Sequence, residues 1–168
     1  SKFIPWQPSL PKPISEPDKI DLMITHLSKQ TKNNRILVMA NTEVMTSNLC
    51  PKLFKNFVEQ ISANVVYSVN GDNIATLTQA NNLGHIMLGG NDAAINAWND
   101  LDENDTLILL GVDVGEYVLN QKGLPKCTIF CFTQLLGAYG QKADSYHHLA
   151  SLKHYTEIKG NIKTSLEL

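Results

Sequence analysis

The sequence has a single arginine, three cysteines and no long apolar run, and each shortage argues against a class of protein. Nucleic-acid binding needs clustered cations, but the 14 Lys and Arg residues are outnumbered by 16 Asp and Glu and form no basic stripe. The longest strongly apolar stretch, TLILLGV at 106–112, is the length of a strand and too short to span a membrane. We therefore expect neither nucleic acid nor membrane as a partner.

The cysteines and the first residues bear on the cellular compartment. Cys50, Cys127 and Cys131 are odd in number, and residues 1–13 contain no apolar core of a signal peptide. This pattern is typical of reduced thiols in the cytoplasm, so we predict a cytoplasmic protein. Cys127 and Cys131 would share one strand face and pack there. The chain does not begin with Met, so we expect it to be part of a longer protein.

The chain divides into a short linker and one domain. Residues 1–17 hold five of the seven prolines and are predicted to be an extended linker, whereas 18–168 have the length of a single α/β domain. Apolar residues at helical spacing predict helices at 18–30, 50–62, 73–82, 91–101 and 115–121, and from 161 onward. Short apolar runs predict strands at 35–40, 64–69, 85–89, 106–111, 127–132 and 155–159.

Strands that alternate with helices, and that read as continuous apolar runs, indicate a parallel sheet covered on both faces. We predict a three-layer, Rossmann-like α/β domain with about six parallel strands and helices on both faces. In the first helix Asp18 is predicted to be the N-cap, and the inward residues are Ile20, Met23, Ile24 and Leu27. In the helix at 91–101 the inward residues are Ile95, Trp98 and Leu101.

Ligands of such sheets bind beyond the carboxyl ends of the strands, where this chain carries glycines and polar residues. Gly89-Gly90 precede a helix whose free N–H groups favour an anion, and Gly111 permits a positive φ or close approach. The alternative is a plain turn, because no G-x-G-x-x-G follows the first strand and Asn91 or Asp92 would cap the helix. The candidate cofactor-binding residues are Asn41, Gly89, Gly90, Gly111, Val112 and Asp113.

The stretch VNGDNIATLTQANN, at 69–82, contains Gly71-Asp72 and Asn81-Asn82, residue types that hold magnesium in thiamine-diphosphate enzymes. One short helix would separate the two pairs by about 1.5 Å per residue, so both could not reach one ion at about 2 Å. We interpret them as a turn and the end of a helix. We predict surface or edge positions for the histidines, no metal site and no catalytic residue. Asn104-Asp105-Thr106 is a glycosylation sequon, idle in a cytoplasmic protein.

The stretch LGHIMLGGNDAAINAWNDLDENDTLILLGVDVGEY, at 83–117, resembles the central domain of thiamine-diphosphate-dependent enzymes such as acetolactate synthase, pyruvate oxidase and benzoylformate decarboxylase. YTEIKGNIKTSLEL, at 155–168, is similar to the end of that domain, and the Pro-rich start is similar to its entry linker. The resemblance implies a six-stranded parallel domain between two thiamine-binding domains, which hold thiamine diphosphate and magnesium, in a homo-oligomer. The six candidate residues are where FAD would bind, although Ala40, Asn41 and Thr42 stand where FAD-binding members usually have glycines.

The resemblance leads to a functional expectation. The chain would be the central domain of an acetolactate-synthase-like lyase or transferase acting on 2-oxo acids, structural or nucleotide-binding and not catalytic alone. Two alternatives stay open from the residues themselves. One is a free-standing Rossmann-like domain that binds FAD, NAD or an adenylate, and the other is a small enzyme working through Asp113 or Glu116.

Overall fold

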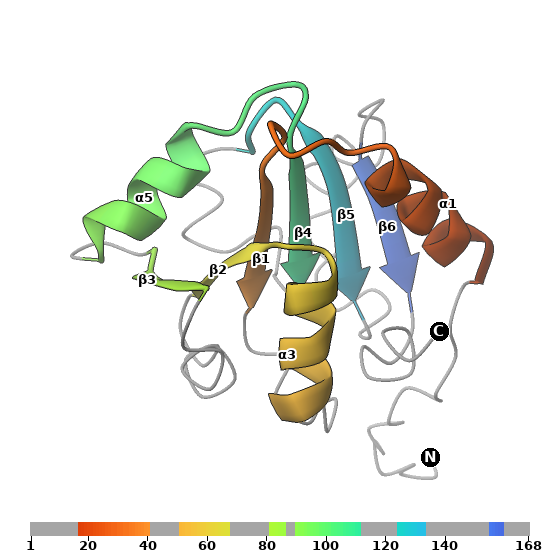
Figure 1. Ribbon diagram of the computed structural model, residues 1–168, viewed down its shortest axis with the longest axis horizontal. Coiled ribbons are helices and arrows are strands. Elements are labelled where there is room, and N and C mark those ends of the chain that lie inside the picture. Colours follow the sequence, from red (N-terminus) through yellow and green to blue (C-terminus); the bar gives the residue numbers. More distant parts are fainter. Residues whose placement is uncertain are drawn as a thin grey trace, which may run out of the picture.

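The computed structural model describes residues 17–40, 51–67, 81–86, 90–111, 124–133 and 155–159. Their helices and strands alternate along the chain (Figure 1). The helices in these ranges are α1 (Pro17–Ser28), α3 (Pro51–Gln60) and α5 (Asp92–Asn99). The strands are β1 (Ile36–Ala40), β2 (Asn64–Tyr67), β3 (Asn82–His85), β4 (Thr106–Leu110), β5 (Thr128–Thr133) and β6 (Tyr155–Lys159).

The six strands form one sheet in the order β3-β2-β1-β4-β5-β6, and every neighbouring pair is parallel. The chain runs outward from β1 to β3 and then returns to the other side of β1 as β4. The predicted fold class is therefore confirmed. The order 3-2-1-4-5-6 is that of dinucleotide-binding folds, and it puts the change of direction between β1 and β4.

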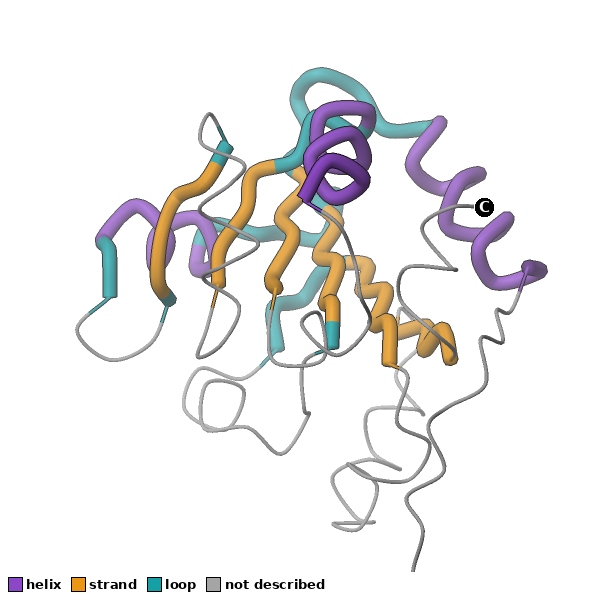
Figure 2. The backbone as a smooth tube through the Cα atoms, turned by 90° about the horizontal axis from the view of Figure 1, so that it is seen from below, coloured by secondary structure: helices purple, strands orange, loops and turns teal. Residues whose placement is uncertain are grey.

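Helices cover both faces of this sheet. In Figure 2, α1 and α3 lie on one side, where their apolar residues share a core with Val38 and Ala40 of β1. The alternate residues of β1, Leu37 and Met39, pack with Trp98 of α5 on the opposite face. Successive strand residues point to opposite faces, so a strand covered on both sides needs apolar residues throughout. This explains the unbroken apolar runs of β1 and β4.

The first helix differs from its prediction in two details. It begins at Pro17, so Asp18 lies in its first turn and is not the N-cap; proline is favoured there because the first helical N–H needs no partner. Ile20 and Met23 are buried and Leu27 packs on the core, as predicted. Ile24 is 48% exposed, and the prediction that it points inward is wrong. It lies at the margin of the apolar stripe, where α1 faces a groove.

The third strand lies three residues earlier than predicted. β3 occupies 82–85 instead of 85–89, and Asn82 begins this strand instead of ending a helix. Pairing with β2 sets the position, because the Val65 amide already donates to the Asn81 carbonyl at 2.7 Å. Residues 73–80 of the helix predicted at 73–82 lie outside the described residues, as do residues 1–16 of the linker and the helices predicted at 115–121 and 161–168.

In α5, Trp98 is buried as predicted and Leu101, just beyond the helix, is 8% exposed. Ala94 is buried, whereas Ile95 is only half-buried, so the first inward residue of α5 is Ala94 instead of the predicted Ile95. Asn91 occupies the N-cap position but makes no capping hydrogen bond through its side chain. Its Oδ1 instead accepts a hydrogen bond from the His85 amide at 3.0 Å.

Candidate functional site

The carboxyl ends of β1 and β4 form the first candidate site. Ala40 and Leu110, the last residues of these strands, pair with each other in register. Gly111 follows directly, is buried and has a φ of 66°, a conformation that strongly favours glycine. Its N–H donates to the Phe132 carbonyl at 2.8 Å. Gly111 can therefore offer a ligand close approach of the backbone, but its N–H is already used within the sheet.

The structure does not bring Gly90 next to Gly111. Gly90 follows β3, which β2 and β1 separate from β4. β3 and β4 are three strand spacings of about 4.8 Å, or about 14 Å, apart, so only an extended ligand could reach both strand ends. The other candidates, Asn41, Gly89, Val112 and Asp113, lie outside the described residues, as does Glu116. Ligand binding by the six residues stays a prediction.

The described residues do not fit a magnesium site. They contain no group of three or more His, Cys, Asp or Glu side chains that could hold a metal ion. Asn82, half of the Asn pair that resembled a magnesium motif, uses its Oδ1 to accept the Gly84 N–H at 2.9 Å. Gly71 and Asp72 lie outside the described residues. No step of thiamine-diphosphate chemistry can be assigned to the side chains that the structure describes.

The two described cysteines are structural. Cys127 and Cys131 are both buried in the core on the α5 side of the sheet, as predicted. Burial raises the pKa of the Cys127 thiol to about 12, and the nearby Asp105 adds to the effect. A thiol with such a pKa stays protonated at neutral pH, so Cys127 is not a nucleophile.

A buried aspartate ties the amino ends of β1 and β4 together. The Asp105 side chain is 3% exposed and accepts hydrogen bonds from the backbone N–H of Arg35 at 2.7 Å and of Asp102 at 2.9 Å. The Arg35 Nε also lies 3.2 Å from its Oδ2. This cluster is at the end of the sheet opposite to Gly111. Asp105, which the sequence marked only as part of a sequon, thus has a structural role.

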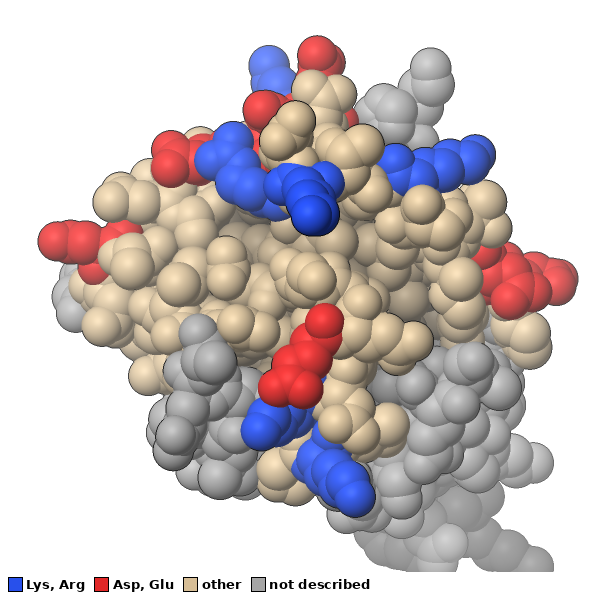
Figure 3. Space-filling model, in the orientation of Figure 1, with Lys and Arg blue, Asp and Glu red and all other residues tan. Residues whose placement is uncertain are grey.

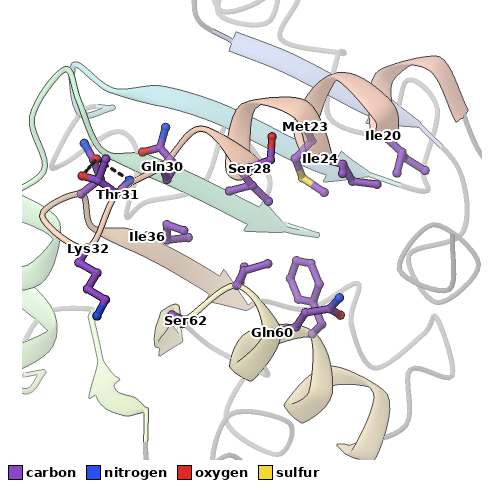
Figure 4. A pocket seen from close by; sticks show the side chains of 14 residues that line it. Ile20, Met23, Ile24, Ser28, Gln30, Thr31, Lys32, Ile36, Gln60 and Ser62 are labelled. Carbon is purple, nitrogen blue, oxygen red and sulfur yellow. Dashed lines mark hydrogen bonds between the residues drawn. The ribbon is translucent and has the colours of Figure 1, made fainter.

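A groove of about 630 Å³ between α1 and α3 is the second candidate site. Figure 4 shows Ile20, Met23 and Ile24 of α1 lining it, with Ile36 of β1 among the other lining residues. Among its described lining residues, Lys32 alone is charged. Figure 3 shows both basic and acidic side chains along the upper rim of this face and, below them, a largely uncharged surface that a group of acidic and basic side chains interrupts. The groove can accommodate apolar groups, and its described lining residues include no carboxylate, histidine or cysteine.

His26 holds α1 against the start of β4. Its Nε2 lies 2.8 Å from the Thr106 hydroxyl and 3.4 Å from Gln30 Nε2, and its ring is 5.5 Å from that of Phe130. Burial lowers the pKa of His26, and Lys29 lowers it further. His26 is half-buried, and periodicity could not identify its partner, which is 80 residues away.

We expect acid to destabilise the fold through His26. Its pKa is lowered in the folded protein, so the unfolded chain binds the proton first as pH falls below the ordinary value of 6.5. The stabilisation by neutral His26 is therefore complete above that pH and is lost as pH falls towards the lowered folded value. Urea unfolding at about pH 7.5 and about pH 5.5 measures the loss. A His26→Gln variant should show a smaller loss, and an equal loss in both proteins would contradict this assignment.

The fold and the carboxyl-end position of Gly111 define a three-layer, Rossmann-like α/β domain with the strand order of dinucleotide-binding proteins. No protein-family model matches the chain, and no curated protein matches its sequence. Its structure is similar to that of a "putative thiamin diphosphate-dependent enzyme" isolated from Mycobacterium smegmatis, with a TM-score of 0.52 and 14% identity. The match covers 90% of this chain and 27% of that one. At this identity the likeness shows the fold alone.

A search of the described residues for membrane-spanning segments found no helix of sufficient length and apolar character.

Proposed function

We propose that the chain is the central domain of a thiamine-diphosphate-dependent enzyme that acts on 2-oxo acids. The observation that carries the proposal is the fold, which matches a stretch of the Mycobacterium smegmatis protein over 90% of this chain. The match spans only 27% of that protein, as expected for one domain of a longer chain. The resemblance of residues 83–117 and 155–168 to the central domain of this enzyme family supports the same conclusion.

In this proposal the chemistry belongs to the parent enzyme, an acetolactate-synthase-like lyase or transferase in the cytoplasm. Thiamine diphosphate and magnesium would be held by the two flanking domains, in a homo-oligomer. The domain itself would position its neighbours and could bind a nucleotide such as FAD at the strand ends.

Calorimetry separates this role from catalysis by the chain alone. We expect residues 1–168 to give no heat with thiamine diphosphate and magnesium, whereas the complete natural protein binds the cofactor and consumes a 2-oxo acid. The complete reading frame should encode a thiamine-binding domain on each side, with a Gly-Asp-Gly…Asn-Asn motif in the C-terminal one. Binding of thiamine diphosphate by residues 1–168, or a reading frame without these domains, would contradict the proposal.

A free-standing nucleotide-binding domain is the second candidate function, and Gly111 favours it. This buried glycine with positive φ lies at the carboxyl end of β4, where the strand order changes direction. If FAD, NAD or ATP binds, replacement of Gly111 by Ala should weaken binding by about tenfold or more, because a Cβ strains the backbone and blocks close approach. Gly90→Ala is the control and should change the affinity for ATP little, because β2 and β1 separate the end of β3 from the end of β4. Absence of heat with all three nucleotides would eliminate this candidate.

A further inference from the structure

The outer edge of β3 is the part of the sheet where association with another chain could begin. β3 is at one end of the strand order, and its four residues are all half-buried. Strands at the edge of a sheet present unpaired N–H and C=O groups to which a further strand can add. Whether β3 can be extended depends on where its outward peptide groups are bonded.

The peptide groups of His85 point outward from β2. His85 pairs with Tyr67 in the parallel ladder, and the N–H of the next residue, Ile86, donates to the Tyr67 carbonyl at 3.0 Å. Successive residues of a strand direct their peptide groups to opposite sides, so the N–H and C=O of His85 face away from β2. An added seventh strand would bond to these two groups.

Asn91 occupies both groups instead. Its side-chain Oδ1 accepts the His85 N–H at 3.0 Å, and its backbone N–H donates to the His85 carbonyl at 2.9 Å. A single residue therefore makes the pair of hydrogen bonds that a neighbouring strand would make. Asn91 is anchored in turn at the start of α5, where its carbonyl accepts the Ile95 N–H at 3.1 Å. This use of Oδ1 also explains why Asn91 does not cap α5.

Gly84 makes room for this arrangement. It has a φ of 107°, and a Cβ placed on it would lie 2.5 Å from both Cγ and Oδ1 of Asn91. Its own N–H donates to Asn82 Oδ1, and the pairing of β2 with β3 shifts register between Val65 and Val66. The strand is thus irregular where Asn91 crosses it, which makes its edge a poor template for a straight partner strand.

We infer that Asn91 closes the β3 edge at His85 against strand addition, so that the sheet is not extended there in the assembly of the protein. Association with other domains or with further copies of the chain must then use side-chain contacts or other surfaces. The inference rests on the geometry around His85 alone and does not depend on the proposed enzymatic role.

Two substitutions of Asn91 test the inference. Asn91→Leu keeps a side chain of similar size but has no acceptor, whereas Asn91→Asp keeps an oxygen at the same position. We expect amide hydrogen exchange at His85 to become about tenfold faster in the Leu variant, which corresponds to one lost hydrogen bond, and to change little in the Asp variant. Sedimentation should show concentration-dependent association of the Leu variant that exceeds that of the original protein and of the Asp variant.

Circular dichroism shows whether each variant is folded. If the Leu variant does not fold, Asn91→Ser replaces it, because the shorter serine side chain retracts its oxygen from the strand. Unchanged exchange at His85 would overturn the inference, because Asn91 would then not protect the edge. Faster exchange without increased association would overturn it as well, because the opened edge would then not accept a strand.

Discussion

Replacing Asp105 by Ala is expected to lower the free energy of unfolding by about 2–4 kcal/mol, because two part-buried backbone N–H groups lose their charged acceptor. These are the amides of Arg35 and Asp102, at 2.7 and 2.9 Å from the carboxylate. The ion pair with Arg35 adds little, since the Arg35 side chain is 51% exposed and screened by solvent. Urea unfolding at constant m-value measures the change.

Asp102→Ala is the control for Asp105. Its side chain is 57% exposed and lies 3.7 Å from Arg35 Nη2, so its removal should cost less than about 1 kcal/mol. Asp105→Asn keeps one acceptor oxygen, so its loss of unfolding free energy should be between those of Asp102→Ala and Asp105→Ala. Equal losses for Asp102→Ala and Asp105→Ala would show that the carboxylate does not join the two strands as the structure indicates.

Replacing Phe130 by Ala is expected to cost about 3–5 kcal/mol, the range for a buried aromatic side chain. Phe130 is 2% exposed and packs in the core with α1 and α3. Its ring also lies 5.5 Å from that of His26. Since burial is the main cause of the lowered His26 pKa, a cavity that admits water should move this pKa back towards its ordinary value.

Phe130→Leu separates the loss of stability from the change of the His26 pKa. It keeps most of the apolar volume and should lower the free energy of unfolding by only about 1–2 kcal/mol. The pKa of His26 follows from the ring proton shifts in an NMR titration. We expect little change of this pKa in the Leu variant and a clear rise in the Ala variant. A folded Phe130→Ala protein with an unchanged His26 pKa would contradict the assignment of desolvation by this ring.

Much of the fold could be predicted because burial on both faces leaves a clear pattern in the sequence. β1, β4 and β5 are unbroken apolar runs, and each occurs within one residue of its predicted position. β3 was misplaced because its residues are only half-buried and carry no such run. The apolar residues that follow, including buried Ile86, made the later position look like the strand.

The candidate site was predictable only in part. Glycine after a buried strand indicates a turn that a ligand could approach, and Gly111 has the expected positive φ. The sequence could not tell which strand ends are neighbours, because strand order is set by long-range pairing. The order found here puts Gly111 beside the end of β1, whereas Gly90 follows β3, which is two strands away from β1 on the other side. The contacts of His26 with Thr106, and of Arg35 with Asp105, join residues 70 or more positions apart.

The sequence by itself determined the class of this protein, a parallel α/β domain, because local periodicity and continuous burial are encoded residue by residue. Only the tertiary structure decided the roles of its polar residues. Asn91 is a predicted N-cap and occupies that position, but its side chain closes a strand edge instead of capping the helix. Asp105 is predicted only as part of an idle sequon, and its carboxylate joins two strands. The physical reason is that a polar side chain bonds to the polar group that the fold brings within about 3 Å. That group can be distant in the chain or belong to another element, so the sequence alone does not identify it.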